Sequence, residues 1–152
     1  MHWDEFARVA PDFAAAGMRL LIKDQGVAIG FLATVHRCLH LAPVCPIFCT
    51  PGMYLCAGGT TPKRIDLERD GRYVLHAFLG ENDEEFRISG RAALVTDEAE
   101  RARVHAAIRF GAFNRADPLF RFDVDGAMWG YWENAGKPDT RPIRRVWPEK
   151  KL

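Results

Sequence analysis

The sequence has no apolar run of roughly 18 residues, no excess of one charge and no repeat or low-complexity linker. Without such a run we expect no membrane-spanning helix. A formal net charge of +1 over 152 residues gives no overall field that would attract nucleic acid or anionic lipid. The start, MHWDEFARVAPDF, is too acidic and too amphipathic for a signal peptide. We therefore expect one domain over residues 1–152 that resides in the cytoplasm and binds neither nucleic acid nor membranes.

Cysteine is sparse, and its spacing does not match a metal site. The four cysteines, Cys38, Cys45, Cys49 and Cys56, fall within one apolar stretch. None of them forms the Cys-x-x-Cys spacing of a zinc knuckle. Free cysteine in a reducing compartment behaves as a small hydrophobic residue. The sequence therefore predicts four free thiols, no disulfide framework and no metal.

Apolar periodicity predicts a mainly β protein with flanking helices. Residues 3–24 have helical spacing with a restart at Pro11, and Asp97 with Glu100 is typical of a helix start that leads to a helix ending near Arg109. Apolar or alternating runs predict strands over 27–35, 41–49, 52–59, 72–80, 85–95 and 119–125. Six strands with short connections favour a closed or nearly closed antiparallel barrel, and an α+β sandwich is the alternative.

A short helix predicted over residues 61–70 has its charges reversed. It begins with Lys63 and Arg64 and ends with Glu68 and Asp70, whereas the helix dipole favours acids at the start and bases at the end. A phosphate at this N-terminus would explain the reversal, because backbone N–H groups, hydroxyls and cations would all face it. The alternative is a solvated surface helix, whose dipole mismatch costs only about 0.3–1 kcal/mol. Spacing alone leaves both interpretations open.

Other polar residues have ordinary structural interpretations. His36 and His40 flank a predicted hairpin turn, where exposed histidines are common. His76 lies in a strand and is expected to be hydrogen-bonded, and His105 is expected to be solvated on its helix. The acidic run 83–85 is interpreted as a solvated turn and not as a general acid/base pair. No catalytic residue is assigned.

Several segments together resemble the pyridoxamine 5′-phosphate oxidase-like, FMN-binding split-barrel family. They are GFLATV, APVCPIF, MYLCAGGTTPKRIDLERDGRYVLHAF, FRISGRAALVTDEAERARV and LFRFDVDGAMWGYWENAGKPDTRPIRRVW, and they cover nearly the whole chain. The resemblance implies a six-stranded antiparallel split β-barrel with flanking α-helices. It also implies a homodimer with FMN in a groove between the two subunits.

The resemblance implies a set of cofactor-binding residues. Thr60, Thr61 and Lys63 match the segment that holds the FMN phosphate, and Arg64 is a further candidate. Pro43, Val44 and Cys45 match the strand whose main chain passes the flavin ring. Trp129 and Trp132 match an aromatic stretch that covers the flavin of the other subunit, and Arg141 follows them into the site.

The first hairpin departs from the family pattern, because only HRCLH occupies a turn that is usually longer and often ends in a basic residue. Arg37 or His40 is the substitute that this chain offers. For Trp129, Trp132 and Trp147 the alternative to flavin contact is packing in the core or at the dimer interface.

The resemblance implies a flavin-dependent oxidoreductase acting on a small molecule, with the ring chemistry belonging to FMN. Pyridoxamine or pyridoxine 5′-phosphate is one possible substrate, and a nicotinamide-driven flavin reductase is another possibility. The alternative class is a protein that binds flavin, a deazaflavin coenzyme or haem on the same barrel without turnover. A third possibility is an empty barrel that serves as an interaction dimer.

Overall fold

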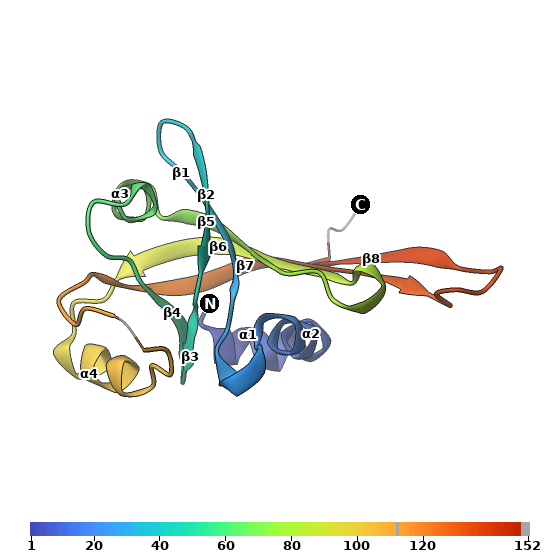
Figure 1. Cartoon of the computed structure of the whole chain (residues 1–152), viewed down its shortest axis with the longest axis horizontal. Coiled ribbons are helices and arrows are strands. Elements are labelled where there is room, and N and C mark those ends of the chain that lie inside the picture. The colour runs from blue at the N-terminus through green and yellow to red at the C-terminus, as the bar shows by residue number, and fades with distance from the viewer. Residues whose placement is uncertain (112, 150–152) are drawn as a thin grey trace.

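The structure is a computed structural model that describes residues 1–111 and 113–149. One curled antiparallel sheet of eight strands forms most of the molecule (Figure 1). The strands are β1 (Gly30–Val35), β2 (Leu39–Val44), β3 (Ile47–Cys49), β4 (Gly52–Cys56), β5 (Arg72–Ala77), β6 (Glu85–Leu94), β7 (Leu119–Glu133) and β8 (Arg141–Trp147). Their order is β2-β1-β5-β6-β7-β4-β3, and β8 pairs with β7.

The sequence predicts six strands, whereas the structure has eight in the described residues. The run 41–49 is divided between β2 and β3 at Pro46, which has no N–H to donate to a ladder. The aromatic segment after residue 125 continues β7 to Glu133, and the chain then returns as β8. The ends of the sheet, β2 and β3, do not pair with each other among the described strands, so the sheet is a curled half-barrel.

Four α-helices accompany the sheet: α1 (Trp3–Val9), α2 (Pro11–Leu21), α3 (Pro62–Arg69) and α4 (Glu98–Ala106). Two single 3-10 turns cover Asp24–Gly26 and Glu81–Asp83. The restart at Pro11 and the cap at Asp97 are confirmed, since the Glu100 N–H donates to Asp97 Oδ1 at 2.7 Å. No helix in the described ranges combines the length and the apolar character needed to cross a membrane.

The core lies where α1 and α2 pack under the sheet (Figure 1). Phe86 and Ile88 of β6 are fully buried, and Phe86 lies so close to α2 that only a glycine fits at position 17 without displacing the ring. The predicted inward alternation holds for these two residues but fails toward the end of β6, where Leu94 is half exposed. Leu94 is the last residue of β6, and Ala92 before it still packs on the core. The pairing of β6 with β7 shifts after Ser89, where Asp125 of β7 is left without a partner, so this bulge changes the alternation of β7.

Two hairpins project from the body in different directions (Figure 1). The β1–β2 hairpin stands beside α3, and its edge strand β2 exposes Leu39 at 73% and Leu41 at 68%. The β7–β8 hairpin extends to the far end of the long axis and exposes Trp132 at 43%. Both hairpins therefore present apolar side chains that no part of the described chain covers.

Candidate functional site

The loop before α3 contains polar groups that are not used in capping the helix. Thr61 is the N-cap residue, but its hydroxyl donates to Gly58 O at 3.1 Å instead of capping the helix. Pro62 occupies the first helical position, where its missing N–H costs nothing. Gly59 has a φ of +62°, and a side chain there would meet nothing within 4 Å, so the loop faces open space. Thr60 is exposed beside it.

Some backbone N–H groups of this loop are not used in hydrogen bonds within the described chain. The Arg64 and Ile65 N–H groups bond back to Thr61 O at 3.0 and 3.3 Å. Within residues 1–111 and 113–149, the N–H groups of Thr60 and Lys63 have no hydrogen-bond partner, whereas Thr61 closes a turn over Gly59 and Thr60. Free N–H groups at a helix start are the usual ligands of an anion.

The structure accounts for part of the reversed charge pattern within the chain itself. Glu68 accepts from Arg64 Nε at 2.9 Å, and Arg64 Nη1 donates to Gly59 O at 2.7 Å. Asp70 is held by Arg72, whose guanidinium lowers the pKa of Asp70 to about 2. Arg64 therefore braces the loop, and its guanidinium is already engaged.

The positive charge of Lys63 at the start of α3 is the part of the reversed pattern that no contact balances in the described chain. No ion pair or hydrogen bond joins its ammonium to the part of the chain that the structure describes. The first turn of α3 contains no acid to balance it. The Thr60 hydroxyl, free N–H groups and one unpaired ammonium form a donor set whose chemistry fits a phosphate, and the Thr61 hydroxyl would add to it by leaving Gly58 O.

The predicted ring-contact residues lie at the end of β2. Val44 is buried in the core opposite Gly30, so its side chain is unavailable to a ligand and only its main chain can take part. Pro43 is exposed on the other face, and Cys45 is half-buried in the connection to β3. Contact between this main chain and a flavin ring stays a prediction.

The predicted aromatic residues do not share a face. Trp129 and Trp132 are three positions apart in β7, so strand alternation sends them to opposite sides of the hairpin. Trp129 packs against Phe13 and lies 5.3 Å from the Arg145 guanidinium. Trp132 is exposed, and Arg141 pairs with Glu133 at 2.5 Å.

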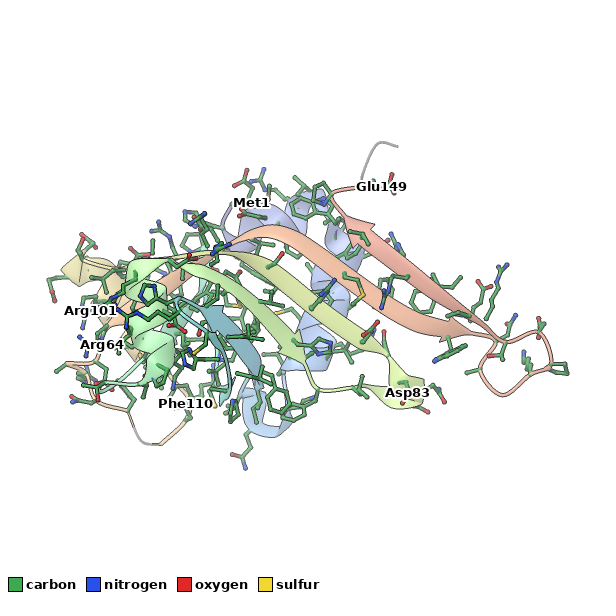
Figure 2. All side chains as sticks on the ribbon, turned by 90° about the horizontal axis from the view of Figure 1, so that it is seen from above. Met1, Arg64, Asp83, Arg101, Phe110 and Glu149 are labelled. Carbon is green, nitrogen blue, oxygen red and sulfur yellow. The ribbon has the colours of Figure 1, made fainter. Side chains whose placement is uncertain are left out.

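Distance along the molecule also separates the predicted residues. Arg64 of α3 lies at the opposite end from Asp83 and Glu149 (Figure 2), and the β7–β8 hairpin extends beyond them (Figure 1). A single chain therefore does not bring Trp132 and Arg141 to the α3 loop.

Two of the predicted solvated acids, Glu84 and Glu85, are instead anchored, whereas Asp83 is exposed as predicted. Glu84 accepts two hydrogen bonds from Arg19, at 2.5 and 2.8 Å, and one from Trp129 Nε1 at 2.7 Å. Glu85 pairs with Arg144 at 3.1 Å. These contacts tie α2 and the β5–β6 turn to the long hairpin, and they occupy Trp129 with a structural role.

The Glu84 network makes stability depend on pH. The Arg19 guanidinium holds the pKa of Glu84 below its ordinary value of 4.5, the Trp129 N–H adds to this, and burial opposes it. The Glu84 network therefore adds to the free energy of unfolding above about pH 4.5, and this addition is lost as the pH falls through the pKa of Glu84 in the folded state. We expect Glu84→Gln to flatten the acid limb of the unfolding free energy measured in urea between pH 3 and pH 6. Exposed Glu81→Gln in the same turn is the control, and parallel curves for wild type and Glu84→Gln would contradict the assignment.

Sequence reasoning missed a buried acid on α3. Asp66 is 3% exposed, and its Oδ2 accepts from Thr34 Oγ1 and lies 2.7 Å from His40 Nδ1. His40, expected to be a solvated turn residue, is thus bonded to α3. His36 accepts from Arg69 at 3.0 Å, and Arg37 is exposed beside it. The signal available in the sequence was an acid on the apolar face of a short helix, one residue before Leu67.

Two further histidines are settled by the structure. His76 is confirmed as hydrogen-bonded, with Nδ1 2.5 Å from Ala77 O. The prediction that His105 is solvated is wrong, because it is 8% exposed and packs on Phe113. Burial lowers the pKa of His105, and Arg101 and Arg115 add to the effect. All four cysteines are free, and the described residues contain no group of three or more metal-binding side chains.

No protein-family model matches the sequence, and no curated protein is a significant match. Solved structures, in contrast, share its fold. The FAD binding protein from Mycobacterium smegmatis aligns with a TM-score of 0.60 at 17% identity, over 87% of this chain and 96% of that chain. A protein from Listeria innocua, provisionally described as a pyridoxamine 5′-phosphate oxidase, aligns with a TM-score of 0.60 at 14% identity, over 78% of this chain and 95% of that chain.

A third neighbour is a heme binding protein from Mycobacterium smegmatis, with a TM-score of 0.56 at 17% identity, over 85% of this chain and 57% of that chain. At such identities the likeness concerns the fold and not the ligand. The fold of these neighbours is the fold that the resemblance implies. The chain therefore has the split-barrel fold of the pyridoxamine 5′-phosphate oxidase-like, flavin-binding proteins.

Proposed function

We propose that this protein is an FMN-dependent oxidoreductase that acts on a small molecule as a homodimer. The observation that carries the proposal is the open loop before α3, where an unpaired Lys63 ammonium lies beside Thr60, Thr61 and free backbone N–H groups. Without an anion, the helix dipole and the Lys63 cation repel each other, at a cost of about 0.3–1 kcal/mol. A phosphate group removes that cost.

The phosphate of FMN would be held by three kinds of donor in this loop. Lys63 contributes charge, Thr60 contributes a hydroxyl, and the helix start contributes N–H groups. The Thr61 hydroxyl would join them after exchange of its bond to Gly58 O. Arg64 serves this site indirectly, since its bond to Gly59 O fixes the loop in place. The main chain at Pro43, Val44 and Cys45 would lie along the ring, with the Val44 side chain remaining in the core.

A second copy of the chain is part of the proposal. Trp132 and Arg141 lie on a hairpin at the far end from α3, so they reach an α3 loop only if it belongs to another subunit. The exposed Leu39 and Leu41 on β2 supply apolar surface for such an assembly. Trp129 donates to Glu84 and lies against the Arg145 guanidinium, so we assign it to packing and not to flavin contact.

FMN would supply two-electron redox chemistry at its ring, so the protein needs no nucleophile of its own for this reaction. The chain's contribution is to bind the phosphate, to position the ring along β2 and to exclude water with the partner's aromatic hairpin. Arg141, Arg144 and Arg145 each pair with an acid, namely Glu133, Glu85 and Asp12. On the resemblance, Arg141 is the candidate cation for an anionic substrate, which it would bind after exchange of its bond to Glu133.

The proposal is tested by the visible absorption spectrum of the purified protein before and after addition of FMN. Mass spectrometry of whatever denaturation releases identifies the bound molecule, and light scattering gives the oligomeric state. We expect a flavin spectrum, release of FMN and the mass of a dimer. A protein that stays colourless and does not respond to FMN would contradict the proposal.

A second candidate function is flavin or haem binding without turnover, which is favoured by the fold shared with a heme binding protein. A deazaflavin coenzyme is a further possible ligand of the same barrel. Rapid mixing with a nicotinamide nucleotide separates the two classes. An enzyme reduces its flavin at a useful rate, whereas a carrier responds only to a strong chemical reductant such as dithionite.

A further inference from the structure

Three side chains form a hydrogen-bonded series between the first hairpin and α3. Cys38 Sγ in the β1–β2 turn lies 3.3 Å from His40 Nε2. The other ring nitrogen of His40, Nδ1, lies 2.7 Å from Asp66 Oδ2. Asp66 is 3% exposed, whereas Cys38 is exposed to solvent. A thiol, an imidazole and a buried carboxylate thus follow one another in hydrogen-bonding order.

The hydrogen bonds assign the proton on His40. Thr34 Oγ1 donates to the same Asp66 oxygen at 2.7 Å, so that oxygen acts as an acceptor. A carboxylate has no hydrogen to donate, and His40 Nδ1 therefore carries the hydrogen of the bond to Asp66. His40 Nε2 then presents its lone pair to the Cys38 thiol. This is the tautomer that a base needs to accept a thiol proton.

Cys38 differs from the other cysteines in its surroundings. Cys45, Cys49 and Cys56 are only partly accessible, and burial raises the pKa of Cys56. Cys49 lies 3.3 Å from Arg103 Nη1 but has no histidine partner. In the described chain, Cys38 is thus the cysteine that combines exposure with a base in hydrogen-bond contact.

A groove of about 450 Å³ opens beside Cys38 between the hairpin and α3. Pro62 and Ile65 give it an apolar side, and its charged lining consists of His36, Arg37, His40, Asp66 and Arg69. Asp66 is buried behind His40, so the charges exposed to a ligand are cationic. The groove therefore favours a small anionic reagent with an apolar part.

We propose that Cys38 is a nucleophilic thiol that forms a mixed disulfide with small anionic disulfides bound in this groove. His40 Nε2 takes the thiol proton as Cys38 Sγ attacks one sulfur of the reagent. The bond between the two reagent sulfurs breaks, and the departing thiolate receives the proton from His40. One disulfide and one thiol are consumed and one of each is formed, so no further oxidant is needed. Asp66 is a positioning residue that fixes the imidazole.

The nucleophilicity of Cys38 is tested by alkylation with neutral iodoacetamide, followed for each cysteine by peptide mass spectrometry. We expect His40→Ala to slow modification of Cys38 by at least about tenfold at pH 7, and added imidazole to restore part of the rate. His36→Ala, in the same hairpin but without contact to the thiol, is the matched control and should change the rate little. A Cys38 rate unchanged by His40→Ala would overturn the proposal, and melting curves verify that each variant folds.

The role of Asp66 is tested by the ¹⁵N NMR shifts of His40. We expect the Nδ1–H tautomer in wild type. Asp66→Asn should shift the proton to Nε2, because an amide nitrogen can donate to Nδ1. A structural role alone would leave the tautomer unchanged.

The preference for anions is tested with two disulfide probes, dithiobis(nitrobenzoate), which is anionic, and neutral dithiodipyridine. We expect Arg37→Ala to slow the reaction of Cys38 with the anionic probe by about threefold or more and to leave the neutral probe unaffected. Equal effects on both probes would overturn the anionic preference. The readout is the modified thiol itself, so these results do not depend on whether FMN binds.

Discussion

Replacing Lys63 by glutamate is expected to abolish tight FMN binding while leaving the fold intact. The change removes a charge-assisted hydrogen bond to the phosphate and places a carboxylate against it. We expect a loss of about 2–5 kcal/mol, or roughly 30-fold to several-thousand-fold in Kd. Titration of the apoprotein with FMN, followed by flavin fluorescence, measures the effect.

The matched control is Arg8→Glu, the same charge reversal on an exposed face of α1 that has no ion pair within the described chain. It should leave FMN affinity unchanged. If α3 is only a surface helix, Lys63→Glu has a different signature. An acid in the first turn then raises the free energy of unfolding by about 0.3–1 kcal/mol without altering FMN affinity. That outcome would remove the phosphate assignment.

The largest effect on stability is expected from Phe86→Ala. Phe86 is fully buried in β6, at the middle of the sheet, and its ring fills the space under Gly17 of α2. Truncation removes the transfer energy of the ring and leaves a cavity that a sheet paired on both sides cannot close. We expect a loss of about 3–5 kcal/mol in the free energy of unfolding measured in urea.

Phe78→Ala is the comparison, because this ring lies just after β5 and is 38% exposed against Phe31 and Lys23. It should cost about 1 kcal/mol, since part of its surface remains in water in the folded state. Similar losses for both variants would show that the site under α2 relaxes after truncation, contrary to the close packing at Gly17.

Much of the fold is predictable from local sequence, and the failures have a common cause. Pro11 and Asp97 act on their own helices, so the helix starts at these positions are confirmed. Val124 and Ala127 of β7 are both buried, although strict alternation would place them on opposite faces. The cause is the bulge at Asp125, which depends on how β7 pairs with β6, and a single strand does not contain that information. β8 was missed for the same reason, because its partner is the extended end of β7.

The candidate sites also differ in whether their residues are adjacent in the sequence or are brought together by folding. Thr60, Thr61 and Lys63 are adjacent in the sequence, so their common placement needs only one loop and could be predicted. Cys38 and Asp66 are joined through His40 only because the β1–β2 hairpin lies against α3. The sequence alone therefore presents His40 as one more exposed histidine.

Pro43, at an exposed position of β2, has a consequence for how the protein avoids aggregation. β2 ends the sheet, and an unpaired edge strand with exposed leucines is a template on which another chain can extend the ladder. Proline has no N–H to donate, so an incoming strand cannot complete its hydrogen bonds past this position. The residue predicted to lie against a flavin ring thus also works against uncontrolled fibre growth whenever a subunit is alone.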